Sequence, residues 1–315
     1  MEKILIIGAN GQLGTELSAA LQEKYGQDAI ISSDIRKPKE ENGTFEMLNV
    51  LDAEALATIV KKHKITQIYH LAAILSAKGE ENPIQTWNVN MNGLLNVLEI
   101  ARHEKLKKIY YPSSIAVFGT TTPSPAPQYT SMNPATIYGI SKRAGEQWCE
   151  YYHNKYGVDV RSLRYPGLIS YKALPGGGTT DYAVDIFYKA VEGEHFNCFL
   201  SENTRLPMMY MPDAVRATME LMDAPKQNLS THEGYNLNAF DCTPKELYNE
   251  IKKHVPNLEI SYKIDELRQS IADSWSDTVT DDVACKDWNW SHKYDMASTT
   301  KEMLVNLKKK LTVEK

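Results

Sequence analysis

The chain has 315 residues but only four cysteines, no long apolar run and no excess of basic side chains. The cysteines are far apart and form no Cys-x-x-Cys pair; they are Cys149, Cys198, Cys242 and Cys285. Such spacing argues against a structural zinc site or a disulfide framework, so we expect no metal. The formal net charge of −5 argues against nucleic acid as a partner, because phosphate binding requires a basic surface.

A membrane-spanning helix is not expected, because no apolar stretch has the length needed to cross a bilayer. An apolar strand begins at Ile4, too close to Met1 for a signal or transit peptide to precede it, which indicates a cytoplasmic protein. The chain is 42% hydrophobic and 24% charged, as is typical of globular proteins. Its length suits one large domain, or a core domain with a smaller one.

Short β-rich runs alternate with amphipathic stretches in the first half of the chain. We expect strands at Ile4–Ile7, Ala29–Ser33, Gln67–His70, Lys108–Pro112 and Val158–Arg164, and helices at Leu13–Lys24, Ala53–Lys62, Pro83–His103 and Thr136–Tyr156. This alternation predicts an α/β fold, a doubly wound parallel sheet with helices on both faces. We assign it to residues 1–168.

The alternation weakens after Arg164. The remaining candidates are helices at Asp181–Val191, Asp213–Met222, Pro244–His254 and Thr299–Lys310, with short strands at Tyr235–Leu237 and Glu259–Tyr262. A flexible loop is expected at Pro175–Gly178. Residues 169–315 are therefore expected to form mainly a smaller substrate-binding lobe, with some segments returning to the sheet.

Three glycines lie between the first strand and the first helix, in the run Gly8-Ala9-Asn10-Gly11-Gln12-Leu13-Gly14. One glycine permits the tight turn, one lets the backbone approach a phosphate, and one lets the helix pack on the strand. The helix N-terminus then offers free N–H groups to a pyrophosphate. The spacing is G-x-x-G-x-x-G, and its place after an apolar strand predicts a Rossmann-type dinucleotide site.

Asp34 ends the second strand, twenty residues after Gly14. A carboxylate there can accept hydrogen bonds from both ribose hydroxyls and repels a 2′-phosphate, which favours NAD over NADP. Arg36 could soften that preference. The full set that we expect to hold NAD comprises Gly8, Asn10, Gly11, Gln12, Leu13, Gly14, Asp34, Ile35, Arg36, Asn49, Val50, Leu71, Ala72, Ala73, Tyr138, Lys142, Tyr165 and Leu168.

Tyr138 and Lys142 lie one helical turn apart and therefore share a helix face. A free phenol is a poor base at neutral pH, and a neighbouring ammonium lowers its pKa. Ser113 and Ser114 follow the fourth strand, where side chains point into the ligand crevice of such sheets. A tyrosine and a lysine at this spacing commonly belong to a solvated helix face. The accompanying glycines, Asp34 and serines favour the catalytic interpretation.

These motifs resemble the extended short-chain dehydrogenase/reductase family, whose pattern is G-x-x-G-x-x-G, a Ser or Thr, then Y-x-x-x-K. The resemblance covers nearly the whole chain. The chain is most similar to the short-chain-type L-threonine 3-dehydrogenases, which look like UDP-galactose 4-epimerases. The stretches that carry this similarity are Pro112–Gly119, Leu174–Ala183, Ile271–Trp275 and Asp287–Trp290.

The resemblance implies oxidation of L-threonine by NAD⁺ to 2-amino-3-oxobutanoate. Tyr138 would be the general base, Lys142 would lower its pKa, and Ser114 would orient the substrate hydroxyl, with Ser113 as a substitute. Ser76, Thr179 and Thr180 would bind the amino acid. A rival interpretation makes Thr179 and Thr180 the N-cap of the helix that begins near Asp181.

Two other functions remain open. An NAD-dependent nucleotide-sugar epimerase or dehydratase would share the same glycines, Ser114, Tyr138 and Lys142. A non-enzymatic NAD-sensing regulator could use the same fold, although such proteins commonly lose the Tyr–Lys pair. The resemblance also implies a homodimer whose helices Pro83–His103 and Thr136–Tyr156 pack against those of a second copy.

Overall fold

The computed structural model describes residues 2–38, 42–172 and 176–313. Its centre is a parallel sheet of seven strands in the order β10-β6-β5-β4-β1-β2-β3. The strands are β1 (Ile4–Ile7), β2 (Ile30–Asp34), β3 (Thr44–Met47), β4 (Gln67–His70), β5 (Lys108–Ser114), β6 (Val160–Tyr165) and β10 (Tyr235–Asn236). The predicted α/β doubly wound fold is confirmed, and the order reverses between β1 and β4, where ligands bind in such sheets.

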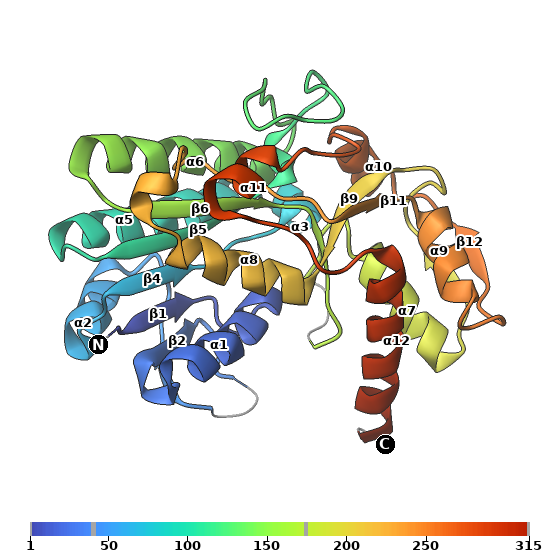
Figure 1. Cartoon of the computed structure of the whole chain (residues 1–315), viewed down its shortest axis with the longest axis horizontal. Helices are drawn as coiled ribbons and strands as arrows, with labels where there is room; N and C mark the ends of the chain where they lie inside the picture. The colour runs from blue at the N-terminus through green and yellow to red at the C-terminus, as the bar shows by residue number, and fades with distance from the viewer. Residues whose placement is uncertain (1, 39–41, 173–175, 314–315) are drawn as a thin grey trace.

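Apolar helices cover both faces of this sheet (Figure 1). On one face lie α2 (Ala53–His63), α5 (Gly93–His103) and α6 (Ile137–Tyr156), whose buried side chains share one core cluster with Leu5 and Ile68. On the other face lie α1 (Gln12–Tyr25), α8 (Met211–Asp223) and α11 (Asp282–Trp288), packed with Ile4 and Ile6. Strand residues are therefore buried on both sides, as a parallel sheet requires.

Both ends of helix α6 are capped. The Thr136 Oγ1 accepts a hydrogen bond from the Gly139 N–H at 3.0 Å, and Gly157 ends the helix with a left-handed φ of 72°. A side-chain acceptor at the N-cap and a left-handed glycine at the end satisfy backbone groups that the helix leaves unpaired. The caps fix where α6 begins, and so which of its side chains face the carboxyl end of β5.

The helix expected at Pro83–His103 is interrupted. It consists of α4 (Pro83–Trp87), a π-helical turn η2 (Asn88–Asn92) and α5. Within the turn, Asn90 is buried and its side chain pairs with both backbone groups of Ile74, accepting from N at 2.8 Å and donating to O at 3.1 Å. Such π turns often lie at functional sites. The preceding helix α3 (Ser76–Glu81) was not predicted.

The C-terminal part builds the smaller lobe (right side of Figure 1). It contains the sheets β11-β9-β7 and β12-β8 and its own core cluster. Its elements are β7 (Gly167–Ile169), α7 (Tyr182–Glu192), β8 (Phe196–Cys198), β9 (Leu206–Tyr210), β11 (Phe240–Cys242), α9 (Pro244–Lys252), β12 (Ile260–Tyr262), α10 (Glu266–Asp273) and α12 (Met296–Val313). Strand β10 returns to the main sheet beside β6, as expected. The loop predicted at Pro175–Gly178 is described only from Gly176 onward.

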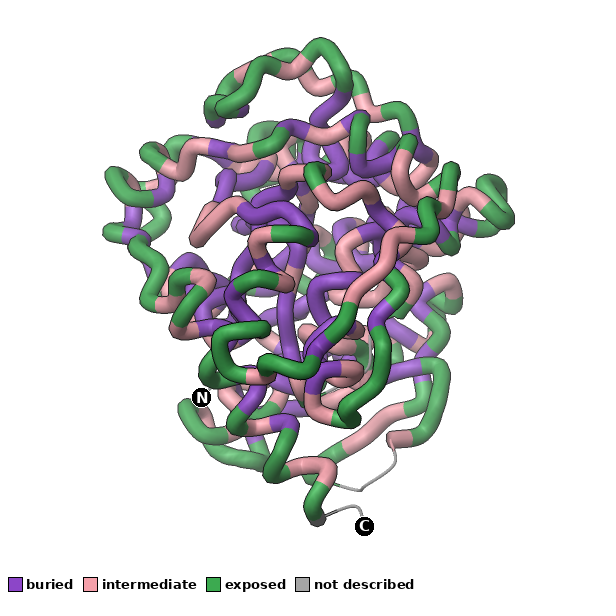
Figure 2. Tube along the Cα trace, turned by 90° about the vertical axis from the view of Figure 1, so that its right-hand side faces the viewer, coloured by how far each residue is buried: buried purple, intermediate pink, exposed green. Residues whose placement is uncertain are grey.

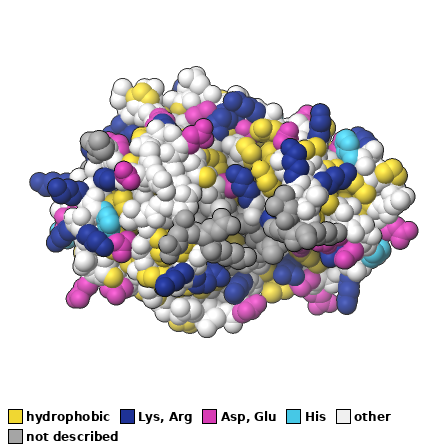
Figure 3. All heavy atoms as spheres, turned by 90° about the horizontal axis from the view of Figure 1, so that it is seen from below, with side chains coloured by type: hydrophobic (Ala, Val, Ile, Leu, Met, Phe, Trp, Pro, Cys, Tyr) yellow, Lys and Arg dark blue, Asp and Glu magenta, His cyan; other side chains and the backbone are white. Residues whose placement is uncertain are grey.

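Buried residues fill the middle of the molecule and exposed ones lie at its outside (Figure 2). Three single-turn 3-10 helices complete the chain: η1 (Gln27–Ala29), η3 (Ile115–Val117) and η4 (Lys226–Asn228). Within the described ranges, no helix combines the length and apolarity that a bilayer crossing needs. Basic and acidic side chains are interspersed over the face shown in Figure 3.

Candidate active site

A cavity of about 810 Å³ opens at the carboxyl ends of β1, β4 and β5. Its wall includes most of the site residues predicted from the sequence: Gly8, Asn10, Gly11, Gln12, Leu13, Gly14, Ile35, Arg36, Leu71, Ala73, Ser76, Ser113, Ser114, Tyr138, Lys142, Tyr165, Leu168, Thr179 and Thr180. The fold therefore brings together residues that lie as far apart in the sequence as Gly8 and Thr180.

The glycine-rich turn is shaped by close backbone contacts. Gly8 has a φ of 87°, and a Cβ on it would lie 2.7 Å from the Ala72 N. A Cβ on Gly14 would lie 2.3 Å from the Gly8 O. Any larger side chain at either position would push the turn away from β1 and β4. The N-terminus of α1 consequently faces the cavity, as the binding of a pyrophosphate requires.

The turn also leaves room and donors for a dinucleotide. Gly11 is the N-cap of α1 and is exposed, so its backbone is accessible from the cavity. The buried Nε2 of Gln12 has no hydrogen-bond partner among the described residues. This unpartnered donor lies beside the glycine turn, where a Cβ on Gly8 or Gly14 would clash with backbone. Together they fit the phosphates of NAD.

Asp34 lies at the end of β2, behind the cavity wall. Its Oδ2 accepts from the Asn10 N–H and its Oδ1 from the Arg36 N–H, both at 3.2 Å. The Asn10 side chain in turn donates to the Arg36 O at 2.7 Å. The carboxylate therefore also fixes the two loops between which the adenosine ribose would lie.

Besides Asp34, three predicted cofactor residues do not line the cavity. Asn49 is exposed and its Oδ1 accepts from the Leu51 N–H at 3.1 Å. Val50 is buried in the core, where it limits the space at Gly93. Ala72 contributes backbone that packs against the glycine turn. Their contact with the cofactor stays a prediction.

Tyr138 and Lys142 project from the first turns of α6 toward the end of β5. The Lys142 Nζ donates to the Pro112 O at 2.7 Å and lies 5.6 Å from the centroid of the Tyr138 ring. The Ser114 hydroxyl is hydrogen bonded to the Tyr138 phenol and also accepts from the Ala116 N–H at 3.2 Å. A phenol, an ammonium and a hydroxyl thus meet at one point of the wall.

Burial moves the pKa values of this pair in opposite directions. It raises the pKa of Tyr138 to about 12, although the hydrogen bond from Ser114 opposes the shift. It lowers the pKa of Lys142 to about 8, with Cys149 and Glu146 opposing. The lowered tyrosine pKa that the sequence predicts is not found, because desolvation of the phenol outweighs the hydrogen bond from Ser114.

Ser113 has a different role from Ser114. Its Oγ donates to the Oε1 of Glu146 at 2.6 Å, and both residues are buried. The expectation that it could replace Ser114 beside the phenol does not match this placement, since neighbouring strand residues point to opposite faces.

The proposed amino-acid end of the cavity is formed by α3 and the turn before α7. The Ser76 Oγ lies 3.1 Å from the Thr179 Oγ1 and accepts from the Thr179 N–H at 3.3 Å. Asp181, not a threonine, is the N-cap residue of α7, and no side-chain capping bond is present there. The rival N-cap interpretation of Thr179 and Thr180 is therefore wrong.

Further residues of the wall were given no role from the sequence, among them Lys78, Asp181 and Trp275. The Asp181 Oδ2 accepts from the N–H groups of Gly177 at 2.8 Å and Gly178 at 2.7 Å, and burial raises its pKa to about 6. In the sequence, the only indication that the Asp181 carboxylate accepts these hydrogen bonds is the nearby glycine run. Trp275 reaches the cavity from a loop that follows α10, which no local pattern reveals.

Known proteins match the chain over nearly its whole length. An uncharacterized epimerase/dehydratase of Staphylococcus haemolyticus is 45% identical, covering 98% of this chain and 99% of its own. The holo structure of a GalE-like L-threonine dehydrogenase from Cupriavidus necator is 54% identical, with a TM-score of 0.95 and coverage of 97% and 99%. A monomeric L-threonine 3-dehydrogenase from a metagenome is 50% identical, with the same TM-score and coverage.

The model of the NAD dependent epimerase/dehydratase family matches residues 4–237. These matches confirm NAD as the cofactor and an oxidoreductase of the extended short-chain dehydrogenase/reductase type. The chain belongs to the NAD-dependent epimerase/dehydratase family.

Proposed function

We propose that the protein oxidises L-threonine at its 3-hydroxyl, with NAD⁺ as the acceptor, to give 2-amino-3-oxobutanoate. The observation that carries the proposal is the geometry at the end of β5. Ser114, Tyr138 and Lys142 face one cavity together with Ser76, Thr179 and Thr180. Solved relatives named as L-threonine dehydrogenases, at 50% and 54% identity, support the choice of substrate.

The residues divide the chemistry between them. Bound NAD⁺ would supply the hydride acceptor and a positive charge. Ser114 hydrogen bonds the substrate oxygen and orients the hydroxyl toward Tyr138. Tyr138 takes the hydroxyl proton as the hydrogen on the same carbon leaves with its electron pair, so that a ketone forms. The Lys142 ammonium favours the phenolate and, held by the Pro112 carbonyl, can also bind the nicotinamide ribose.

Ser76, Thr179 and Thr180 hold the amino and carboxylate groups. Ser76 lies at the start of α3, and Thr179 and Thr180 lie at the turn before α7. A hydroxyl can donate to the carboxylate or accept from the ammonium, so these groups can partner both ends of an amino acid. The pairing of Ser76 with Thr179 keeps the two elements at a fixed separation.

The test is an assay of NAD⁺ reduction with L-threonine, L-allo-threonine, L-serine and 3-hydroxybutyrate as separate substrates. We expect a clear preference for L-threonine. Equal rates with all four alcohols, or none with any, would contradict the proposal.

A nucleotide-sugar epimerase or dehydratase is the second candidate, because relatives at 44% and 45% identity are named as uncharacterized epimerase/dehydratases. It needs the same Tyr138, Lys142 and Ser114. Titration with UDP sugars, followed by calorimetry and by product analysis, separates the two. NAD⁺ binding without turnover of either substrate class would favour the regulator instead.

We also propose that two copies associate through α4 and α6. These adjacent helices expose large apolar side chains, with 74% of Ile84, 38% of Trp148 and 47% of Tyr151 accessible. Burying such a patch favours association. Light scattering after size exclusion should show a dimer, Tyr151→Glu should yield a monomer, and Tyr129→Glu on an exposed loop should not. A monomeric parent protein would refute this proposal. The metagenome relative is named as a monomer, so that outcome has a precedent among similar proteins.

A further inference from the structure

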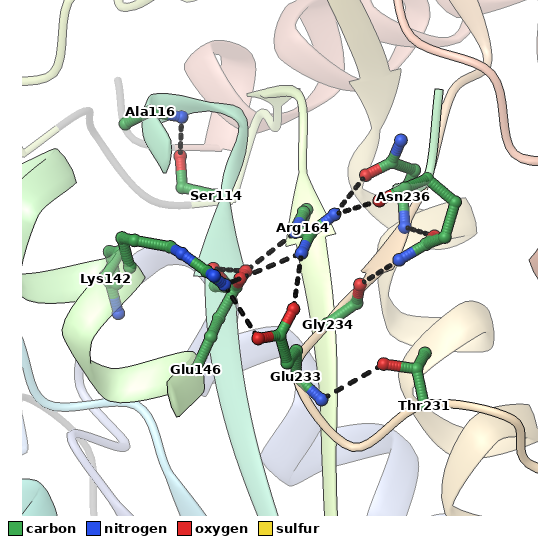
Figure 4. A network of polar contacts seen from close by, with 12 residues as sticks. Ser114, Ala116, Lys142, Glu146, Arg164, Thr231, Glu233, Gly234 and Asn236 are labelled. Atoms are coloured by element: carbon green, nitrogen blue, oxygen red, sulfur yellow. Dashed lines mark hydrogen bonds and ion pairs between the residues drawn. The ribbon is translucent and has the colours of Figure 1, made fainter. Parts of the chain in front are cut away.

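A buried ion pair lies behind the end of β5. Glu146 is on α6, one turn beyond Lys142, and Arg164 is on β6; their side chains are 0% and 1% exposed. The Arg164 Nε donates to the Glu146 Oε1 at 2.8 Å, and its NH2 donates to the Oε2 at 2.9 Å. Figure 4 shows Arg164 between Glu146 and Asn236. Two parallel bonds fix the carboxylate in both position and orientation.

The remaining polar atoms of the pair are also occupied. The Arg164 NH1 donates to the Gln128 O at 3.0 Å and to the Asn236 Oδ1 at 3.1 Å. The Glu146 Oε1 accepts a second bond, from the Ser113 Oγ at 2.6 Å. A buried pair is weak evidence for stability, because a well-packed apolar pair of the same volume often does as well. The bond to Ser113 suggests a more specific use.

Ser113 is the cross-strand neighbour of Arg164, and it lies between two groups that face the reaction. The carbonyl of Pro112 receives the Lys142 ammonium, and the hydroxyl of Ser114 is bonded to Tyr138. Strand β5 ends at Ser114, where η3 begins. A side-chain bond at Ser113 therefore fixes the last strand residues, and with them both neighbouring groups.

We propose that Glu146, held by Arg164, is a positioning residue that anchors Ser113 and thereby places Ser114 and the Pro112 carbonyl against Tyr138 and Lys142. Glu146 itself does not line the cavity. The inference rests on the proposed roles of Tyr138 and Lys142. A displacement of about 1 Å at a reacting group can cost ~100-fold in rate, so a distant anchor of this kind has a measurable effect.

Glu146→Gln is not the best test, because it leaves the buried guanidinium of Arg164 with only the partly exposed Glu233, 3.6 Å away, as an ion-pair partner, and the variant could fail to fold. Ser113→Ala removes only the bond to β5 and leaves the ion pair. Gly234→Ala acts from the other side, since a Cβ on Gly234 would lie 2.8 Å from the Glu146 Oε1 and would displace the carboxylate without changing any charge.

Each variant should lower kcat for L-threonine by ~10- to 100-fold, while KM for NAD⁺ stays near that of the parent. The thermal midpoint should also stay near that of the parent in Ser113→Ala, which leaves the ion pair intact. The primary isotope effect with 3-deuterated substrate should rise, because the chemical step becomes limiting. The double variant should be no slower than Ser113→Ala alone, since Glu146 acts through Ser113. Losses that multiply, or an unchanged isotope effect, would assign the ion pair to stability alone.

The parent protein separates this inference from the proposed function. If the parent does not oxidise L-threonine, the proposed function fails. The same variants are then compared in the UDP-sugar reaction of the second candidate, which needs the same three residues. If the parent is active and Ser113→Ala is equally fast, only the positioning role of Glu146 is refuted.

Discussion

The ammonium nitrogen of Lys142 lies 5.6 Å from the centroid of the Tyr138 ring, one turn along the same helix. Burial raises the pKa of that phenol to about 12, so the phenol is protonated at neutral pH. In the proposed reaction, this phenol accepts the proton once a substrate hydroxyl and the charge of the oxidised cofactor join it.

Tyr138→Phe tests the proton transfer directly. Removal of a general base typically costs ~100- to 10,000-fold in rate, and we expect kcat to fall within that range. NAD⁺ affinity, measured by calorimetry, should change little, because the ring remains. Tyr151→Phe is the matched control, since Tyr151 lies on the same helix but is 47% exposed and outside the cavity. Full turnover by Tyr138→Phe would remove the phenol from the mechanism.

Lys142→Met tests the cost of burying an amine. The folded pKa of about 8 lies below the ordinary lysine pKa of 10.5, so between these pH values the unfolded chain binds more protons than the folded one. The stability of the parent should therefore rise with pH across that window, by up to ~3 kcal/mol relative to the variant. Below about pH 8 both states are protonated, and the full penalty remains.

Denaturant unfolding of both proteins at about pH 7 and about pH 10 measures this difference. Lys142→Met should be the more stable protein at the lower pH, and its advantage should shrink at the higher one. An advantage that does not depend on pH would show that the amine is solvated in the folded state.

Local patterns predicted the positions of candidate residues in the fold where one short segment carries the information. The turn at Gly8–Gly14, the carboxylate of Asp34 and the pair Tyr138–Lys142 each lie within or beside a single strand–helix unit. Periodicity likewise predicted α6 within one residue of its ends. Such features depend on interactions between residues that are close in the sequence, so they can be inferred from the sequence alone.

The features that the sequence did not predict depend on contacts between distant segments. The π turn at Asn88–Asn92 is associated with the bonds of Asn90 to Ile74, sixteen residues away. The direction of Ser113 is set by Glu146, thirty-three residues on. The upward pKa shift of Tyr138 comes from burial by several elements at once. No one-dimensional pattern contains these.

Gly14→Ala should disrupt the dinucleotide site sterically. Its Cβ would lie 2.3 Å from the Gly8 O and 2.8 Å from the Ala9 Cα, so the turn must move. We expect NAD⁺ binding to weaken at least ~10-fold, or about 1.4 kcal/mol. Gly26→Ala is the control: it places a Cβ in open space at a φ of 87°, and should lower stability without affecting NAD⁺. Equal NAD⁺ affinity in both variants would contradict the role of Gly14.

Asp34→Ala should reduce the preference for NAD over NADP. A carboxylate that accepts ribose hydroxyls contributes ~1.5 to 3 kcal/mol per charged hydrogen bond, so NAD⁺ affinity should fall ~10- to 100-fold while NADP⁺ affinity stays level or improves. Since the carboxylate also holds the N–H groups of Asn10 and Arg36, Asp34→Asn is needed as a comparison that keeps one side-chain acceptor oxygen. If the preference depends on charge, Asp34→Asn should reduce the difference in affinity between NAD⁺ and NADP⁺. It should weaken NAD⁺ binding less than Asp34→Ala does. A cofactor ratio that is unchanged in both variants would show that Asp34 shapes the loops but does not read the ribose.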